Sequence, residues 1–291
     1  MNVNEDELAR EVIERGRPSL APKPNGEGPR ASPELVSVVI PCFGQYEYTR
    51  LCVPSLLRHS RPPFELIFVD AGSLDGTAEY LTGLQAGSSL RIEIVRVDDG
   101  TGLGAAFDQG LVHARGRFVT LLSNDTIVTD GWLHQLTALA DADPKIAAVG
   151  PMTNYGTPPQ FVKETPYRLA LRNGSPNMPE EALERFSRDW REGHKGKWFE
   201  TDHLDAFCIL FKREVLGGIG PLDQLARPDG PSLGVRALDG NGLSLAIRRT
   251  GAKMACCHDL FIHHFGSRQA VLAAPTGQPQ PSIRAAQVTE R

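Results

Sequence analysis

A single aspartate, Asp125, ends a short apolar run and is the first candidate for chemistry. Residues 118–122 are apolar and rich in strand-forming types, Ser123 and Asn124 follow, and residues 131–133 open a helical pattern. Asp125 is therefore expected in a loop at the carboxyl end of a strand, where open α/β sheets bind their ligands. A carboxylate there could hold a metal-bound phosphate. The alternative is a turn or helix-capping aspartate.

A second aspartate, Asp70, occupies the equivalent position on an earlier strand. Residues 66–69 are apolar, Gly72 and Ser73 follow as a turn, and Asp75 is placed to cap the next helix. Asp70 could accept hydrogen bonds from a nucleobase imide or a ribose. The alternative is a turn aspartate that accepts from local backbone N–H groups.

A glycine-rich stretch at residues 98–106 enters a predicted helix and superficially resembles a dinucleotide-binding loop. It follows the third strand, and no acidic residue stands at a strand end about 20 positions later, so we reject that interpretation. We interpret its glycines, including Gly102, as allowing the backbone to approach a sugar diphosphate closely.

Alternating strands and helices must position these residues. Strands are predicted at residues 35–40, 65–69, 90–97 and 118–122, and helices at residues 48–57, 77–84 and 103–114. Repeated βαβ units predict an α/β fold with a central, mostly parallel sheet flanked by helices on both faces. Pro41, Asp70 and Asp125 would then converge at the carboxyl edge of the sheet.

The alternation stops after residue 150. Residues 155–199 contain five prolines and a predicted amphipathic helix at residues 180–191, a pattern that favours a lid or an inserted segment. The strand pattern returns at residues 206–212 and 253–263.

Both ends of the chain are predicted to lie outside the folded domain. Residues 1–34 form an extension with one short helix at residues 8–16 and a proline-rich linker at residues 17–33. Residues 271–291 have almost no large apolar side chains and are predicted to be a disordered tail. The folded domain is therefore expected to span residues 35–270.

Composition describes an ordinary globular protein. The 291 residues carry a net charge of -4, with 23% charged and 41% apolar residues, so no overall basic field exists to attract nucleic acid. The five cysteines are odd in number and lack metal-ligand spacing, which indicates reduced thiols and a cytoplasmic location. Neither a secretory leader nor a run of about 18 apolar residues is found, so no transmembrane segment is expected.

In order and spacing, these motifs resemble family 2 glycosyltransferases of the GT-A fold, including the rhamnosyltransferase-like ones, over residues 36–269. The matching segments are residues 38–41, 70–77, 102–110, 123–126, 131–133, 207–208, 212–215, 219–223 and 263–267. The resemblance implies that a sugar moves with inversion from a nucleotide-diphosphate donor to a glycan or other hydroxyl acceptor. It also implies a divalent cation, Mn²⁺ or Mg²⁺, that bridges the donor's phosphates.

The resemblance assigns a role to each candidate. The implied nucleotide-sugar site consists of Pro41, Asp70, Gly102, Asn124 and Asp125. Asp70 would contact the base, and Asp125 would ligate the cation, with His263 and His264 as further ligands. Histidine is compatible with manganese. The alternative for the two histidines is a buried pair at a strand end that bonds to the backbone.

Two positions depart from the family's pattern. Ser123 stands where the metal motif often carries an acid, although many relatives have asparagine there. In residues 236–245, Gly240 takes the place of the family's general base, and Asp239 is the candidate substitute. A positioned base contributes about 10²- to 10⁴-fold in rate. Two hypotheses follow: an active inverting transferase with Asp239 as the base, or a catalytically silent GT-A protein that binds a nucleotide, a glycan or a partner protein.

The resemblance also suggests how the domain is divided. Residues 35–150 would bind the nucleotide sugar, and residues 151–270 would form the acceptor side, with the insertion at residues 155–199 over the acceptor. Uracil- or thymine-type donors and polysaccharide biosynthesis are implied. Peripheral contact with the inner face of the cell membrane stays open, although no amphipathic basic helix argues for it.

Overall fold

The computed structural model describes residues 34–61, 63–167, 169, 171–172, 175–176, 180–225 and 240–266. The predicted helix at residues 8–16, the linker, the tail and Asp239 all lie outside these residues. Within the described part of the chain, no helix is both long enough and apolar enough to cross a bilayer.

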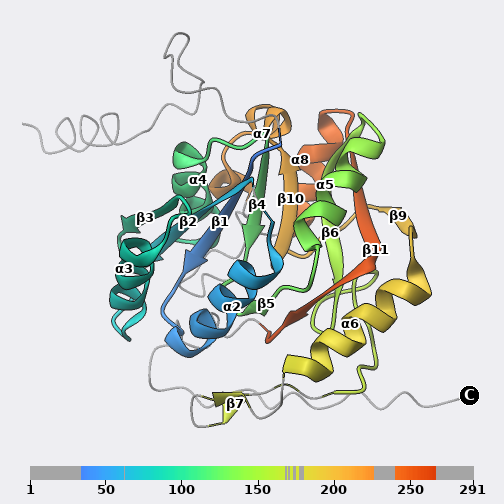
Figure 1. Ribbon diagram of the computed structural model, residues 1–291. Helices are drawn as coiled ribbons and strands as arrows, with labels where there is room; N and C mark the ends of the chain where they lie inside the picture. The colour runs from blue at the N-terminus through green and yellow to red at the C-terminus, as the bar shows by residue number, and fades with distance from the viewer. Residues whose placement is uncertain are drawn as a thin grey trace, which may run out of the picture.

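Among the described residues, a nine-stranded sheet forms the central layer (Figure 1). Its order is β3-β2-β1-β4-β10-β6-β11-β5, and β9 pairs with β11. The strands are β1 (Val36–Cys42), β2 (Phe64–Ala71), β3 (Ile92–Val97), β4 (Phe118–Leu122), β5 (Thr126–Ile127), β6 (Ile146–Thr153), β9 (Trp198–Thr201), β10 (Cys208–Lys212) and β11 (Lys253–His264). A separate pair joins β7 (Leu171–Arg172) to β8 (Ser175–Pro176).

The predicted mostly parallel sheet is confirmed. β1 pairs in parallel with β2 and β4, β2 with β3, and β6 with β11. β10 runs antiparallel to both of its neighbours, β4 and β6. Every residue of β1, β2 and β4 is buried, because helices cover both faces of the sheet.

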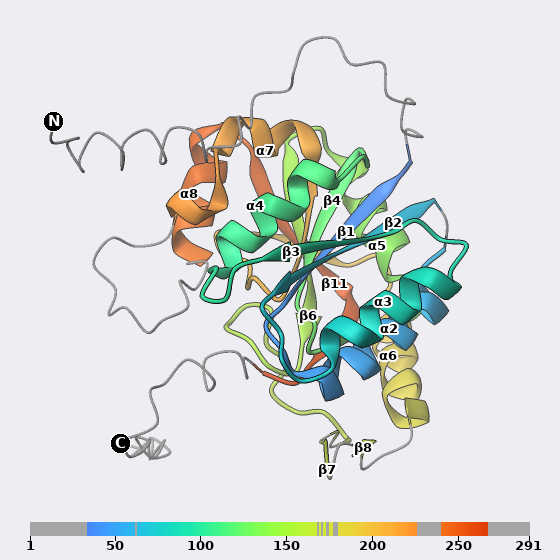
Figure 2. The same cartoon turned by 90° about the vertical axis from the view of Figure 1, so that its left-hand side faces the viewer.

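Helices lie on both faces of the sheet (Figure 2). One face is covered by α2 (Tyr46–His59), α3 (Thr77–Gly87) and α5 (Trp132–Ala142). The other is covered by α4 (Leu103–His113), α7 (Arg213–Ile219), the 3-10 helix η1 (Leu222–Leu225) and α8 (Gly240–Arg249). The insertion contributes α6 (Glu180–His194), which packs on β11, for example through an edge-to-face contact between Phe186 and Phe261.

Predicted and observed elements differ mainly at their ends. The strand at residues 118–122 has the predicted bounds, whereas the strand predicted at 206–212 begins at Cys208. Residue 150 lies inside β6, so the two proposed halves of the domain share one sheet. Asp75 does not occupy the N-cap position of α3, which is Gly76. Its carboxylate instead accepts hydrogen bonds from the backbone N–H groups of Tyr46 and Thr77, at the starts of two helices.

A buried carboxylate, that of Glu65, joins four segments of the chain at the amino end of the sheet. Glu65 on β2 accepts hydrogen bonds from Ser37 Oγ at 2.5 Å and from the backbone N–H of Arg115 at 2.7 Å. Its second oxygen lies 2.6 Å from a guanidinium nitrogen of Arg91. The carboxylate is therefore fully paired although it is removed from water.

We expect Glu65→Leu to lower the free energy of unfolding by about 2 kcal/mol, because the buried hydroxyl of Ser37 loses its acceptor and Arg91 keeps only Glu93 as an anionic partner. Urea denaturation measures the change. The control is Arg248→Gln, which breaks an exposed ion pair with Asp202 of 3.1 Å and should cost less than about 1 kcal/mol. Equal losses in the two variants would contradict the expectation.

Candidate active site

Three of the sequence candidates lie at one edge of the sheet. Pro41 is the next-to-last residue of β1 and pairs with Val69, and Cys42 pairs with Asp70 on β2. Asp125 follows β4, which is the other parallel neighbour of β1. Because parallel neighbours end at the same edge, these residues meet outside the carboxyl ends of the strands.

Asp70 is buried and has two partners in the protein. One oxygen accepts a hydrogen bond from the backbone N–H of Ser73 at 3.1 Å, as a turn aspartate does. The other lies 2.8 Å from a guanidinium nitrogen of Arg96, the residue opposite it on β3. A carboxylate offers about four acceptor positions, so Asp70 can still accept a bond from a ligand. The side chain of Arg96 is 58% exposed and so also faces the solvent at this edge.

The glycine-rich stretch lies beside Asp70, but its glycines have different roles. Gly72 has a φ of +69°, and a Cβ there would lie 2.9 Å from the Cβ of Asp99, so the two loops are in close contact. A Cβ on Gly104 would lie 2.9 Å from the backbone N of Asp223, so this glycine allows η1 to pack on α4. The expectation that all these glycines serve a ligand is therefore wrong for Gly104. Gly102 is the N-cap of α4, in an extended conformation.

Asn124 is buried, and its side chain bonds to the protein. Its Nδ2 donates to the carbonyl of Gly44 at 3.1 Å and to Thr49 Oγ1 at 3.0 Å. These bonds fix the loop after β4 to the loop after β1 and to α2. Asn124 therefore shapes the position of its neighbour Asp125.

Asp125 is a buried carboxylate with one open oxygen. Its Oδ1 accepts a hydrogen bond from Ser123 Oγ at 2.5 Å and lies 3.3 Å from His264 Nε2. Among the described residues, Oδ2 has no partner. Burial alone would raise the pKa of Asp125, but the interactions with His264 and Ser123 outweigh it, and the pKa is lowered. The group is therefore held ionised.

The two histidines at the end of β11 point to opposite faces of the strand, as consecutive strand residues do. The Nδ1 of His264 lies 3.0 Å from the carbonyl oxygen of Tyr155, and its ring stacks on Phe207 at 4.9 Å. Because a carbonyl can only accept, Nδ1 carries the proton, and Nε2 is directed at Asp125. His263 instead has its Nδ1 3.0 Å from the hydroxyl of Tyr167. Burial, and then the charge of His264, lower the pKa of His263 to about 3.

Asp125 and His264 fit a divalent cation. The open carboxylate oxygen and the Nε2 of His264 are suitable ligands, and an Nδ1–H bond to a carbonyl is the usual support of a metal-bound histidine. Among the described residues, no three or more His, Cys, Asp or Glu side chains are grouped so that they could hold a metal ion. The remaining ligands would therefore come from phosphate oxygens or water, as hard cations accept. On the other face of the strand, His263 bonds to Tyr167 through Nδ1, and its Nε2 has no partner among the described residues, so its role as a ligand stays a prediction.

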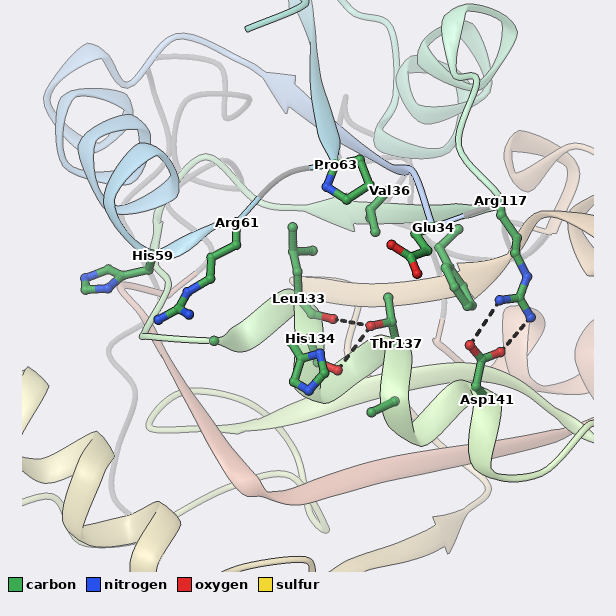
Figure 3. A pocket seen from close by; sticks show the side chains of 13 residues that line it. Glu34, Val36, His59, Arg61, Pro63, Arg117, Leu133, His134, Thr137 and Asp141 are labelled. Carbon is green, nitrogen blue, oxygen red and sulfur yellow. Dashed lines mark hydrogen bonds and ion pairs between the residues drawn. The ribbon is translucent and has the colours of Figure 1, made fainter. Parts of the chain in front are cut away.

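A cavity of about 700 Å³ lies at the opposite edge of the sheet (Figure 3). Its walls include Val36 and Phe118, the first residues of β1 and β4. Arg117 and Asp141 form an ion pair on its rim, with bonds of 3.0 and 2.6 Å. Because it faces the amino ends of the strands, it is separate from the candidate active site.

The structure adds three residues that sequence reasoning missed: Arg96, Asn154 and Tyr155. Arg96 could have been suspected from its position opposite Asp70 in the predicted sheet. Asn154 and Tyr155 gave no signal, because they contact His264 across more than 100 positions of sequence. Gly240 is the first residue of α8, directly after the segment outside the described residues that contains Asp239.

Comparison with known proteins identifies relatives by sequence. Residues 37–220 match the model of the family described as Glycosyl transferase family 2. The match includes Asp70 and Asp125 and ends before Asp239 and His264.

Glycosyltransferase GlyG of Streptococcus pneumoniae is 29% identical over 125 residues, which are 42% of this chain and 40% of that protein. The putative teichuronic acid biosynthesis glycosyltransferase TuaG of Bacillus subtilis is 35% identical over 91 residues, 31% and 36% of the two chains. The chain thus spans less than half the length of these curated relatives.

Solved structures resemble the fold. GalNAc-T7 with UDP, GalNAc and Mn²⁺ has a TM-score of 0.58 and 16% identity, covering 79% of this chain and 44% of that one. The mannosyltransferase PcManGT from Pyrobaculum calidifontis, in complex with GDP-Man and Mn²⁺, has a TM-score of 0.55 and 18% identity, covering 89% and 64%. At these identities the likeness establishes the fold, and the predicted GT-A architecture is confirmed.

Proposed function

The chain belongs to glycosyl transferase family 2, and we propose that it transfers a sugar, with inversion, from a nucleoside-diphosphate donor to a hydroxyl acceptor with the help of a divalent cation. One observation carries the proposal: Asp125 is buried, and one of its two carboxylate oxygens, Oδ2, has no partner in the described part of the chain. A buried anion is costly unless a cation pairs with it. Two structural neighbours that contain nucleotide ligands and Mn²⁺ support this assignment.

The donor would lie across the carboxyl edge of the sheet. Asp70 would accept the imide N–H of a uracil- or thymine-type base, with Pro41 and Arg96 beside it. The N-terminus of α4 at Gly102 offers backbone N–H groups and a positive dipole end for phosphate oxygens. Asp125 and His264 would hold the cation, which would offset the charge of the leaving diphosphate.

The transfer itself needs a base for the acceptor. In an inverting transfer, the acceptor oxygen bonds to the anomeric carbon from the face opposite the leaving diphosphate, and the bond from that carbon to the phosphate oxygen breaks. The hydroxyl proton must then be accepted, and we assign this role to Asp239, next to the start of α8. The nucleoside diphosphate leaves with the electron pair of the broken bond.

For the acceptor and the cellular process, we propose a class rather than a specific molecule. A glycan hydroxyl, bound beneath the insertion that includes α6, is the proposed acceptor. Polysaccharide biosynthesis in the cytoplasm, with peripheral contact at the inner face of the membrane, is the proposed setting. The similarity to TuaG, a putative teichuronic acid biosynthesis glycosyltransferase, supports this setting.

One observation favours a second function. Gly240, at the first position of α8, has no side chain to accept a proton, although the family resemblance places the base there. A protein that keeps Asp70 and Asp125 but lacks a base would bind a nucleotide, a glycan or a partner protein without transferring sugar. Nucleotide binding is expected under both functions, and transfer only under the first.

Calorimetric titration with UDP and dTDP, each with and without Mn²⁺, tests the donor site. We expect binding that strengthens markedly when Mn²⁺ is present, because the cation would join Asp125 to the diphosphate. The same titration with CDP tests the base, since its ring nitrogen offers no imide N–H to a carboxylate. Failure of UDP and dTDP to bind, with or without Mn²⁺, would contradict the proposed donor class.

We expect Asp70→Asn to weaken UDP binding by about 10- to 100-fold, because a charge-assisted hydrogen bond contributes about 1.5–3 kcal/mol. The dependence on Mn²⁺ should be unchanged, since Asp70 is assigned to the base and not to the cation. Titration of the variant with UDP at fixed Mn²⁺ measures the effect. Unchanged UDP affinity would leave Asp70 as a turn residue bonded to Ser73.

A further inference from the structure

The end of β11 is paired with a strand on one side only. On one side, β5 pairs with it, so that His264 lies opposite Thr126 and the N–H of Phe265 donates to the carbonyl of Asp125 at 3.0 Å. On the other side, the pairing with β6 ends at Thr153, whose partner is Ile262. The last residue of β11, His264, therefore extends beyond β6.

The backbone of His264 needs partners on that second side. Alternate residues of an antiparallel strand direct their N–H and C=O groups to alternate sides. Those of Phe265 face Asp125, so those of His264 face the side where β6 has ended. A buried peptide group left without partners is unfavourable.

The side chain of Asn154 provides both partners. Its Oδ1 accepts from the N–H of His264 at 2.9 Å, and its Nδ2 donates to the carbonyl of His264 at 3.0 Å. Asn154 directly follows β6, so its amide extends the ladder as a further peptide unit would. The next residue, Tyr155, accepts the Nδ1–H of the His264 ring at its carbonyl.

We propose that Asn154 is a positioning residue of the cation site, an inference that rests on the proposed function. Its amide fixes the backbone of His264, while Tyr155 fixes the tautomer and Phe207 the plane of the ring. Together they direct Nε2 at Asp125 before any cation binds. Outer partners of this kind typically change metal affinity about 10- to 100-fold when they are removed.

The test measures Mn²⁺ binding to the whole chain with UDP present and no acceptor, by electron paramagnetic resonance. We expect Asn154→Leu to weaken Mn²⁺ binding by about 10- to 100-fold. In spin-echo spectra, the modulation from a histidine ¹⁴N bound to Mn²⁺ should be lost or weakened. Circular dichroism and thermal melting confirm that the variant is folded, and Asn154→Ala serves in its place if it is not.

Gln160 offers a matched control in the same segment. It is a buried amide that also bridges two backbone groups, donating to the carbonyl of Pro151 at 2.7 Å and accepting from the N–H of Asp205 at 2.6 Å. Gln160→Met should lower the melting temperature and leave Mn²⁺ affinity and the ¹⁴N modulation unchanged.

Each outcome decides a different question. Wild-type affinity and ¹⁴N modulation in the folded Asn154 variant, or equal losses in the Gln160 variant, would overturn the positioning role alone. Absence of Mn²⁺ binding in the wild-type chain with UDP would overturn the metal-assisted function, and the inference with it. Mn²⁺ bound by the wild-type chain without ¹⁴N modulation would remove His264 as a ligand and so overturn the inference, while Asp125 would keep its role.

Discussion

Replacing Asp125 with asparagine is expected to remove the effect of Mn²⁺ on nucleotide binding and to slow sugar transfer by about 10²- to 10³-fold or more. Asparagine has the same shape and can still accept from Ser123, so the loop after β4 should keep its position. What it lacks is the negative charge. The proposed cation site depends on the carboxylate of Asp125 and its oxygen without a partner, so the substitution removes the negative charge and keeps the shape.

Titration with UDP at several Mn²⁺ concentrations measures the loss, and the release of UDP from a UDP-sugar measures the rate. Asp108→Asn is the matched control. Asp108 is also a buried carboxylate, but it accepts from the backbone N–H groups of Leu222 and Asp223 at 3.0 and 3.1 Å. Its replacement should lower stability and leave the response to Mn²⁺ intact. A response to Mn²⁺ that survives in Asp125→Asn would place the cation elsewhere.

Sequence patterns predicted β1, β2 and β4 because each of these strands is a short, mainly apolar run followed by turn residues. Residues 118–122 illustrate this, since burial on both faces requires five successive strand-forming side chains between Arg117 and Ser123. The buried strand β6 was not predicted, and neither were the short strands β5 and β9. With two and four residues, they exist because β11 is beside them and have little pattern of their own.

The site was less predictable than the fold, because its decisive contacts join distant parts of the chain. The bonds between Asn154 and His264 span 110 positions, and only the register between β6 and β11 brings the two residues together. The distinction between His263 and His264 was accessible, since neighbours in a strand point to opposite faces. Which of them faces Asp125 depends on the pairing with β5, which the sequence does not specify.

Asp70 shows a different limit of prediction from sequence, which is that one residue can have two roles. Its two interpretations, a ligand for a base and a turn residue, were treated as alternatives. The structure has the turn contact with Ser73 and adds Arg96, yet the carboxylate keeps acceptor positions at the edge of the sheet. A residue type that serves a turn can serve a ligand as well, so local pattern alone cannot separate the two roles.

The second large effect is expected at Asp239. If it is the base, Asp239→Asn should lower the rate of transfer by about 10²- to 10⁴-fold. UDP affinity and its dependence on Mn²⁺ should not change, because a base acts on the acceptor proton and touches neither the nucleotide nor the cation. Hydrolysis of a UDP-sugar or a dTDP-sugar, with water as the acceptor, provides the assay without knowledge of the natural acceptor.

The comparison with Gly240→Asp separates the two proposed functions. In an active enzyme that uses Asp239, the wild-type chain hydrolyses the donor. Because Asp239 already accepts the proton, a second carboxylate at position 240 should change the rate little. In a silent protein the wild-type chain binds UDP with Mn²⁺ but leaves the donor intact, and Gly240→Asp is the change expected to create activity. Donor hydrolysis that persists at the wild-type rate in Asp239→Asn would exclude Asp239 as the base. Because nucleotide binding is measured on the same variants, loss of the base is distinguished from loss of the donor site.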